Sequence, residues 1–200
     1  MERIIGPEEC VAGGFSCRET EGLLSVIVPV YRTEKEAACC IDSLRRQSWK
    51  QMEIIIVNDG SPGRIREMAL EWMLEDSRIR YLEHPENLGL FRARLTGIAA
   101  SRGEFIGFVD SDDEVSYDYF HGLIRRALET GADMVIGRTV RQEGSARFVY
   151  NLHESMLDFD LMEADAFRRL YFSQEGACYG LHTIWNKLCR RRLWENACPC

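Results

Sequence analysis

The segment that decides the fold is Phe105-Ile106-Gly107-Phe108-Val109-Asp110-Ser111-Asp112-Asp113-Glu114. Its first half, Phe105–Val109, is apolar and typical of a buried β-strand, and four carboxylates follow that strand directly. Like charges this close repel one another unless a cation or a broad water shell compensates them. Because hard divalent cations take oxygen ligands, Asp110 and Asp112 are candidate metal ligands, and a solvated acidic turn is the alternative interpretation.

Strand and helix patterns alternate on both sides of this segment, which indicates an α/β fold with a Rossmann-like, mostly parallel sheet. Further strands are predicted at Leu24–Val30, Glu53–Val57, Ile79–Leu82, Asp133–Gly137 and Phe148–Leu152. Helices are predicted near 34–44, 64–76, 87–101, 117–127 and 163–171. We expect Leu24–Val30, Glu53–Val57 and Phe105–Val109 to be parallel neighbours, with helices on both faces of the sheet.

Composition limits the classes of function. The 200 residues are 46% hydrophobic, which suffices for one sizeable core, and the net charge of −7 argues against a general nucleic-acid binder. No stretch approaches the roughly 20 apolar residues of a membrane span. Residues 1–22 are expected to form a loosely ordered leader without the apolar centre of a signal peptide, so a cytoplasmic location is predicted.

Eight cysteines raise the question of disulfides or zinc. Cys39 and Cys40 lie in a helix pattern, where free cysteine packs as a small apolar residue. Without a secretory signal, reduced thiols are the expected state.

Polar signatures follow three of the predicted strands. They are Pro29-Val30-Tyr31, Asn58-Asp59-Gly60-Ser61 and Asp110-Ser111-Asp112-Asp113. Parallel strands end at one edge of a sheet, and α/β proteins bind ligands beyond that edge. The sequence therefore predicts one shared crevice.

With these segments in place, the sequence resembles the bacterial family 2 inverting glycosyltransferases, which have the GT-A fold. The matching segments are Val28–Tyr31 with Glu34, Asn58–Ser61, Asn87–Leu90, Ala93-Arg94, Gly97-Ile98, Gly103–Ile106, Asp110–Asp113 and Trp185–Arg191. Their order and spacing agree from about Leu23 to Trp194. The resemblance implies a nucleotide-sugar-binding part at 23–137 and a mixed, acceptor-side part at 138–200 that is expected to be incomplete.

For the base of the nucleotide, the resemblance implies that Asp59 accepts the N3–H of uracil. Pro29 and Tyr31 would flank the ring, with Tyr31 giving an apolar face and a hydroxyl. The alternatives are that Asp59 caps a turn or a helix, and that Pro29 and Tyr31 pack at a strand end.

For the phosphates, the resemblance implies that Arg94 reaches uridine diphosphate (UDP), with an exposed helix arginine as the alternative. Asp110 would contact the ribose and help to hold a Mn²⁺ or Mg²⁺ ion, and Asp112 would ligate that ion. The ion would neutralise charge on the departing UDP while an acceptor hydroxyl attacks with inversion. A carbohydrate or a lipid-linked molecule is the expected acceptor, and UDP-sugar the expected donor.

The general base remains unassigned. Many members of the family carry it in a Glu-Asp pair well after the segment that Trp185–Arg191 resembles, and this chain has no such pair there. His182, Asp158 and Asp160 are the available titratable groups. We therefore expect a fragment of a longer protein that binds the donor and transfers sugar poorly.

Three residues depart from the family pattern. Arg32 and Asn58 stand where members often have Asn and Asp, and Leu95 replaces an Asn that frequently follows the arginine. Arg32 would add positive charge near a phosphate, whereas the other two changes alter fine donor contacts.

Several alternatives remain open. One is a donor-binding domain without turnover, and another is a structural or interaction domain. A sugar-nucleotide pyrophosphorylase is disfavoured, because Val28–Arg32 lacks the glycines of its phosphate loop. The residues Trp185, Lys187, Arg190–Arg192 and Trp194 would either touch the inner face of a membrane peripherally or form a basic helix packed by its tryptophans.

Overall fold

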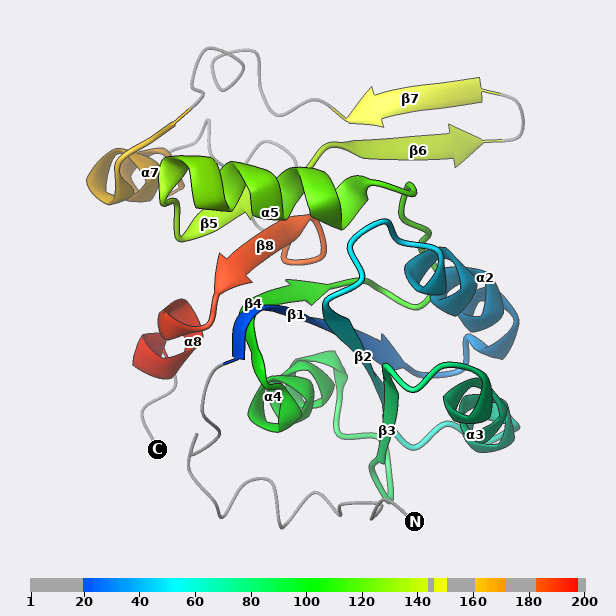
Figure 1. The fold of residues 1–200 in the computed structure, drawn as a ribbon. Helices are drawn as coiled ribbons and strands as arrows, with labels where there is room; N and C mark the ends of the chain where they lie inside the picture. Colours follow the sequence, from blue (N-terminus) through cyan, green and yellow to red (C-terminus); the bar gives the residue numbers. More distant parts are fainter. Residues whose placement is uncertain (1–19, 144–145, 151–160, 172–182, 198–200) are drawn as a thin grey trace.

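The computed structural model describes residues 20–143, 146–150, 161–171 and 183–197, and its centre is a six-stranded sheet in the order β3-β2-β1-β4-β8-β5 (Figure 1). The strands are β1 (Thr20–Val30), β2 (Met52–Asn58), β3 (Ile79–Glu83), β4 (Gly103–Phe108), β5 (Met134–Ile136) and β8 (Lys187–Arg190). A separate two-stranded sheet pairs β6 (Thr139–Glu143) with β7 (Ala146–Tyr150) in antiparallel fashion.

The predicted parallel arrangement is confirmed. β1 pairs in parallel with β2 on one side and with β4 on the other, and β2 pairs in parallel with β3. Every residue of β2 is buried, as the continuous apolar run predicted. The fold is therefore α/β with a mostly parallel sheet.

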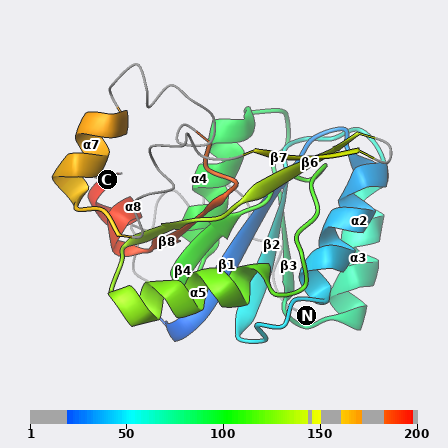
Figure 2. The same cartoon turned by 90° about the horizontal axis from the view of Figure 1, so that it is seen from above.

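Helices cover both faces of the sheet (Figures 1 and 2). On one face, α2 (Glu34–Arg45), α3 (Ile65–Glu75) and α5 (Tyr119–Thr130) pack against side chains of β1, β2 and β4. On the other face, α4 (Leu90–Ala100) and Trp194 of α8 (Arg192–Ala197) close a smaller core. The predicted helix at 163–171 corresponds to α7 (Ala164–Tyr171).

The sequence patterns missed two strands, β6 and β8. The strand predicted at Phe148–Leu152 corresponds to β7 as far as Tyr150, and its last two residues lie outside the described part. β8 lies antiparallel between β4 and β5, so a segment from the far end of the chain completes the main sheet.

The expectation of a basic helix between Trp185 and Trp194 was wrong, because Lys187–Arg190 is a strand and only α8 is helical. Lys187 is buried and donates to the Asn186 side chain at 2.8 Å. Arg191 is also buried and donates to the Gly103 carbonyl and the Ser101 hydroxyl.

The remaining basic side chains of this segment are paired within the molecule. Arg190 pairs with Glu104, and Arg192 pairs with Asp133. Trp194 does pack into the core, as the alternative interpretation predicted, because its ring contacts Phe108 edge to face with centroids 5.5 Å apart. Intramolecular contacts therefore occupy the cationic groups proposed for a membrane surface. No described helix combines the length and apolar character needed to cross a bilayer.

Three described cysteines, Cys39, Cys40 and Cys189, are free thiols. Cys40 and Cys189 are buried, as expected for small apolar packing residues, whereas Cys39 is exposed. Burial raises the pKa of the Cys189 thiol to about 12, so it stays protonated at neutral pH.

We predict opposite effects for alanine at two helical glycines. A Cβ at Gly97 of α4 would lie 2.3 Å from Cγ2 of Ile27 in β1, so the helix would have to move off the sheet. Gly97→Ala should destabilise the fold by about 1–3 kcal/mol, the usual cost of overpacking.

Gly122 of α5 is the matched control, because nothing outside its own helix backbone and chain neighbours lies within 4 Å of the position its Cβ would take. Gly122→Ala should stabilise the fold by about 0.5–1 kcal/mol through helix propensity. Urea unfolding measures both variants, and equal effects at the two sites would refute the packing of α4 on β1.

Candidate functional site

The carboxyl ends of three parallel strands are held in register at one edge of the sheet. Beyond the regular ladders, the Asp59 N–H donates to the Val30 carbonyl at 2.9 Å, and the Val109 N–H donates to the Ile27 carbonyl at 3.1 Å. The residues that follow each strand therefore start from fixed positions. The hydrogen bonds of the sheet thus fix the backbone from which the side chains at this edge project.

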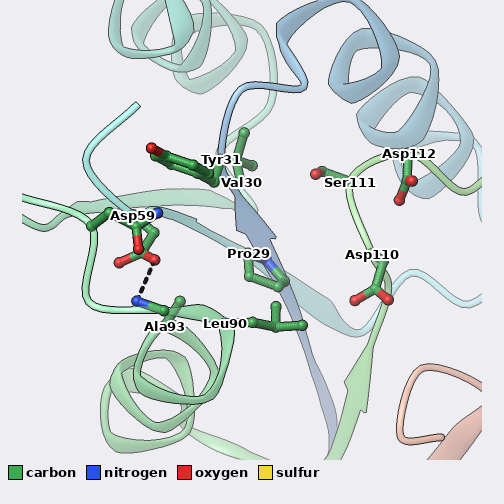
Figure 3. A pocket seen from close by; sticks show the side chains of 11 residues that line it. Pro29, Val30, Tyr31, Asp59, Leu90, Ala93, Asp110, Ser111 and Asp112 are labelled. Atoms are coloured by element: carbon green, nitrogen blue, oxygen red, sulfur yellow. Dashed lines mark hydrogen bonds between the residues drawn. The ribbon is translucent and has the colours of Figure 1, made fainter. Parts of the chain in front are cut away.

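A pocket of about 360 Å³ opens at this edge. Five of the six residues that the sequence singled out line it: Pro29, Tyr31, Asp59, Asp110 and Asp112. Figure 3 shows Asp59 and Tyr31 on one side of the pocket and Asp110 and Asp112 on the other, with Pro29 between them. The sixth residue, Arg94, does not line the pocket but contacts Asp110. The predicted residues are thus brought together.

Asp59 is buried and its carboxylate is heavily hydrogen-bonded. Oδ1 accepts from Nδ1 of His84 at 2.7 Å and from the Leu88 N–H at 2.9 Å. Oδ2 accepts from the Gly89 N–H at 2.8 Å. Asp59 therefore ties the end of β2 to the start of α4, which agrees with the alternative that it caps a helix.

The turn after β2 depends on Gly60 and Asn58. Gly60 has φ +70, and a Cβ there would lie 2.4 Å from the carbonyl carbon of Glu86, so only glycine permits this close approach. The Asn58 side chain accepts from the Ser61 N–H and donates to the Tyr81 hydroxyl at 2.9 Å. The Asn58 Nδ2 also donates to Oε1 of Glu83 at 3.3 Å, which an aspartate could not do, so Glu83 matches this departure from the family pattern.

Arg32 has a left-handed backbone at the end of the Pro29-Val30-Tyr31 segment, with φ 59. Its N–H donates to Oγ of Ser61 at 3.0 Å, and its guanidinium lies 5.0 Å from the centroid of the Tyr31 ring. Side chains with a Cβ are strained in this region, and Asn is among the few that tolerate it. The Asn that family members often carry here suits this backbone better than arginine.

On the opposite side of the pocket, Arg94 donates to Oδ1 of Asp110 at 2.6 Å. The Nε of Arg94 is buried and has no hydrogen-bond partner among the described residues. Ser111 is buried and shares a hydrogen bond of 2.6 Å with the Thr33 hydroxyl, which joins the acidic loop to the loop after β1. The acidic loop is therefore fixed to the neighbouring strand end.

Negative charge dominates this side of the pocket. Burial, and then the carboxylates of Asp113, Asp112, Asp110 and Glu114, raise the pKa of the Cys40 thiol to about 12. Desolvation, followed by repulsion from Asp112 and Asp110, also raises the pKa of Asp113. Within the described part of the chain, Arg94 is the cation paired with this cluster.

Such a cluster fits a hard divalent cation bound together with a ligand. Asp110 and Asp112 both line the pocket, but no group of three or more His, Cys, Asp or Glu side chains among the described residues is arranged to hold a metal ion. Mg²⁺ is usually held by one or two carboxylates, with phosphates and water completing its coordination. Asp110 and Asp112 would supply the two carboxylate ligands of such a site.

Sequence reasoning missed two side chains and leaves three unplaced. His84 and Thr96, whose Oγ1 lies 2.9 Å from Nε2 of His84, extend the network of Asp59. The available signal was that His84 directly follows a buried strand, as Asp59 and Asp110 do. The candidates His182, Asp158 and Asp160 lie outside the described residues.

The comparisons with known proteins identify the family. The Glycosyl transferase family 2 profile matches residues 25–190. The chain belongs to this family. Glycosyltransferase GlyA of Streptococcus pneumoniae is 37% identical over 174 residues, which are 86% of this chain and 25% of GlyA. The uncharacterized glycosyltransferase EpsJ of Bacillus subtilis is 39% identical over 88% of this chain and 50% of EpsJ.

Solved structures agree with the fold. TarS 1-349 of S. aureus in complex with UDP has a TM-score of 0.67 at 20% identity, covering 87% of this chain and 48% of that one. The mannosyltransferase PcManGT of Pyrobaculum calidifontis, in complex with GDP-Man and Mn²⁺, has a TM-score of 0.54 at 16% identity, covering 66% and 40%. The fold is of the GT-A type, as predicted. The chain spans from a quarter to half the length of the two curated relatives.

We predict that Arg32→Asn raises the free energy of unfolding by about 1 kcal/mol, because Asn relieves most of the strain of the left-handed backbone. Arg32→Lys is the control, since lysine keeps the positive charge and the strain, and it should give no gain. Thermal unfolding of the three proteins tests this, and a gain with Lys but not Asn would contradict the strain at this position.

Proposed function

We propose that this chain is the donor-binding part of a glycosyltransferase that moves a sugar from a UDP-sugar to an acceptor hydroxyl with inversion. The observation that carries the proposal is the free acceptor position on Asp59 in the pocket. A carboxylate has about four lone-pair sites, and three of those on Asp59 are occupied by His84, Leu88 and Gly89. The fourth, on Oδ2, suits a single N–H donor.

Uracil supplies such a donor in its N3–H, and a charged acceptor strengthens that bond. Tyr31 lies beside Asp59 in the pocket and offers a ring face for the base, while Pro29 forms an apolar surface between the two sides (Figure 3). The UDP complex of TarS, which shares the fold, supports this choice of nucleotide. We assign Asp59, Tyr31 and Pro29 to the base.

The diphosphate would lie toward Arg94, Asp110 and Asp112. Arg94, held on Asp110 through Nη2, would supply positive charge next to the diphosphate. Asp112, with Asp110, would hold a Mn²⁺ or Mg²⁺ ion, and the Mn²⁺ in the complex of PcManGT supports this assignment. When bound, the ion supplies Lewis-acid stabilisation of the charge on the departing diphosphate.

The division of labour within the chain follows from these assignments. Residues 23–137 would bind the nucleotide-sugar, and residues 138–200 would contribute to the acceptor side, where a carbohydrate or lipid-linked molecule is the proposed partner. A base that deprotonates the acceptor hydroxyl completes the reaction, and none of the described residues is assigned to that role. A donor-binding module without turnover is the second candidate, and parallel assays of UDP binding and sugar transfer distinguish the two.

We predict that Asp59→Ala weakens UDP binding by roughly 10–100-fold, the value of a charge-assisted hydrogen bond. Pyrophosphate binding in the presence of Mg²⁺ should change little, because Arg94, Asp110 and Asp112 are untouched. Calorimetry with both ligands measures the split. Equal losses for UDP and pyrophosphate, or no UDP binding by the unaltered chain, would refute the assignment of Asp59 to the base.

We also predict that Mn²⁺ strengthens the binding of UDP but not of uridine, because two carboxylates need phosphate oxygens to complete the ion's coordination. Asp112→Asn should remove most of this strengthening by deleting a charged ligand while keeping its shape. Glu114→Gln is the matched control, since it removes the same charge from the same loop without touching the pocket lining. UDP titrations with and without Mn²⁺ measure the effect, and metal-independent affinity would exclude the proposed ion site.

A further inference from the structure

His84 is a buried histidine at the end of β3 whose three polar groups are all engaged. Its side chain is 0% exposed. Its N–H continues the sheet by donating to the Asn58 carbonyl at 2.9 Å. Its ring nitrogens contact Oδ1 of Asp59 at 2.7 Å and Oγ1 of Thr96 at 2.9 Å. His84 is therefore fixed by contacts to the end of β2, through Asn58 and Asp59, and to α4, through Thr96.

These contacts define which ring nitrogen carries the proton. The Asp59 carboxylate already accepts two backbone N–H groups and can only accept, so Nδ1 of His84 is the donor of the pair. In the neutral ring, Nε2 is then an acceptor, and the Thr96 hydroxyl donates to it. The acceptor-only carboxylate of Asp59 thus sets the tautomer, and the Thr96 hydroxyl on α4 completes the hydrogen bonding of the ring.

The same bonds fix the carboxylate. His84 and Leu88 fill both lone-pair positions of Oδ1, and Gly89 fills one position of Oδ2. Without the imidazole, Oδ1 would be left with one backbone donor, and the carboxylate could turn about its bond to Cβ. Both oxygens would then have an open position, and only the Leu88 and Gly89 N–H groups would orient the carboxylate.

We propose that His84 is a positioning residue for donor recognition: it orients Asp59 so that a single acceptor position faces the pocket, and it thereby sets the part of the affinity that comes from the uracil base. This inference rests on the proposed function, because it assumes that Asp59 accepts the N3–H of uracil. It makes Asp59 and His84 one recognition unit, in which His84 acts without touching the ligand.

Two substitutions at His84 separate positioning from packing. His84→Phe keeps the ring volume and removes the donor, so UDP affinity should fall roughly tenfold while Mg²⁺-pyrophosphate affinity is unchanged. His84→Asn keeps an N–H donor at the position of Nδ1, so UDP affinity should stay within about threefold of the unaltered chain.

Glu53→Gln provides the control for lost stability. Glu53 is also a buried carboxylate, bonded to Ser25, Arg80 and Arg102, but it lies at the opposite end of β2 from the pocket. Its substitution should lower the melting temperature and leave both affinities unchanged. This result would show that a general loss of stability does not produce the split between UDP and pyrophosphate.

Nitrogen NMR of the histidine rings gives an independent readout. Nδ1 of His84 should carry the proton and Nε2 should not, and UDP should shift both signals. The ring of His121, which stacks edge to face on Trp49 outside the pocket lining, should not respond. A merely structural histidine would show the same tautomer without the response to UDP.

The outcomes are distinguishable from a failure of the proposed function. If the unaltered chain does not bind UDP, the donor assignment fails before any variant is compared, and this inference fails with it. If the unaltered chain binds UDP and His84→Phe binds it equally well, His84 does not position Asp59. Equal losses of UDP and pyrophosphate affinity, or a His84→Asn variant as weak as His84→Phe, would likewise overturn the inference.

Discussion

The buried carboxylate of Asp59 is the constraint on which the pocket depends. A charge taken out of water is costly unless several donors compensate it, and Asp59 meets that condition only when β2, the segment after β3 and the start of α4 come together. All three partners lie in the segment 84–89, which joins β3 to α4. The folded arrangement that satisfies the charge is therefore the one that builds one side of the pocket.

The other side of the pocket shows the opposite electrostatic condition. Asp110 is paired with Arg94, but burial and the surrounding carboxylates raise the pKa of Asp113 and that of the buried Cys40 thiol. A site of this kind is short of positive charge before its ligand arrives. A divalent ion alone would find two carboxylates, and a diphosphate alone would meet their repulsion. In the proposed function, an ion and a diphosphate would therefore stabilise each other's binding at this edge of the sheet.

The parallel half of the fold was predictable because its strands are buried on both faces and read as continuous apolar runs. Their polar endings were equally visible, since a parallel sheet brings Tyr31, Asp59 and Asp110 to one edge. β8 was not predictable in the same way, because Lys187 and Arg190 mark it as an exposed segment. Only the structure supplies their partners, Asn186 and Glu104, from contacts that local periodicity does not encode.

His84 illustrates a second limit. A single histidine carries no pattern of its own, and its meaning depends on the two side chains that its ring nitrogens reach. The departures at Arg32 and Asn58 were visible in the sequence, but their consequences were not. The strain of Arg32 follows from a backbone angle, and the fit of Asn58 follows from its donation to Glu83 on the neighbouring strand. The roles of His84, Arg32 and Asn58 therefore depend on three-dimensional contacts and backbone angles that the sequence does not show.

The position of β8 connects the two parts of the chain through the site. Gly107 of β4 pairs with Leu188, and the strands are antiparallel, so the residues that precede Leu188 run toward the end of β4 that carries Asp110. Asn186 and Trp185 therefore lie toward the same edge of the sheet as the acidic loop. Because the buried Arg191 guanidinium donates to Gly103 and Ser101, a shift of β8 along β4 would break the hydrogen bonds of a buried charge. The late segment of the chain is thus held against the edge where the sugar of a bound donor would meet its acceptor.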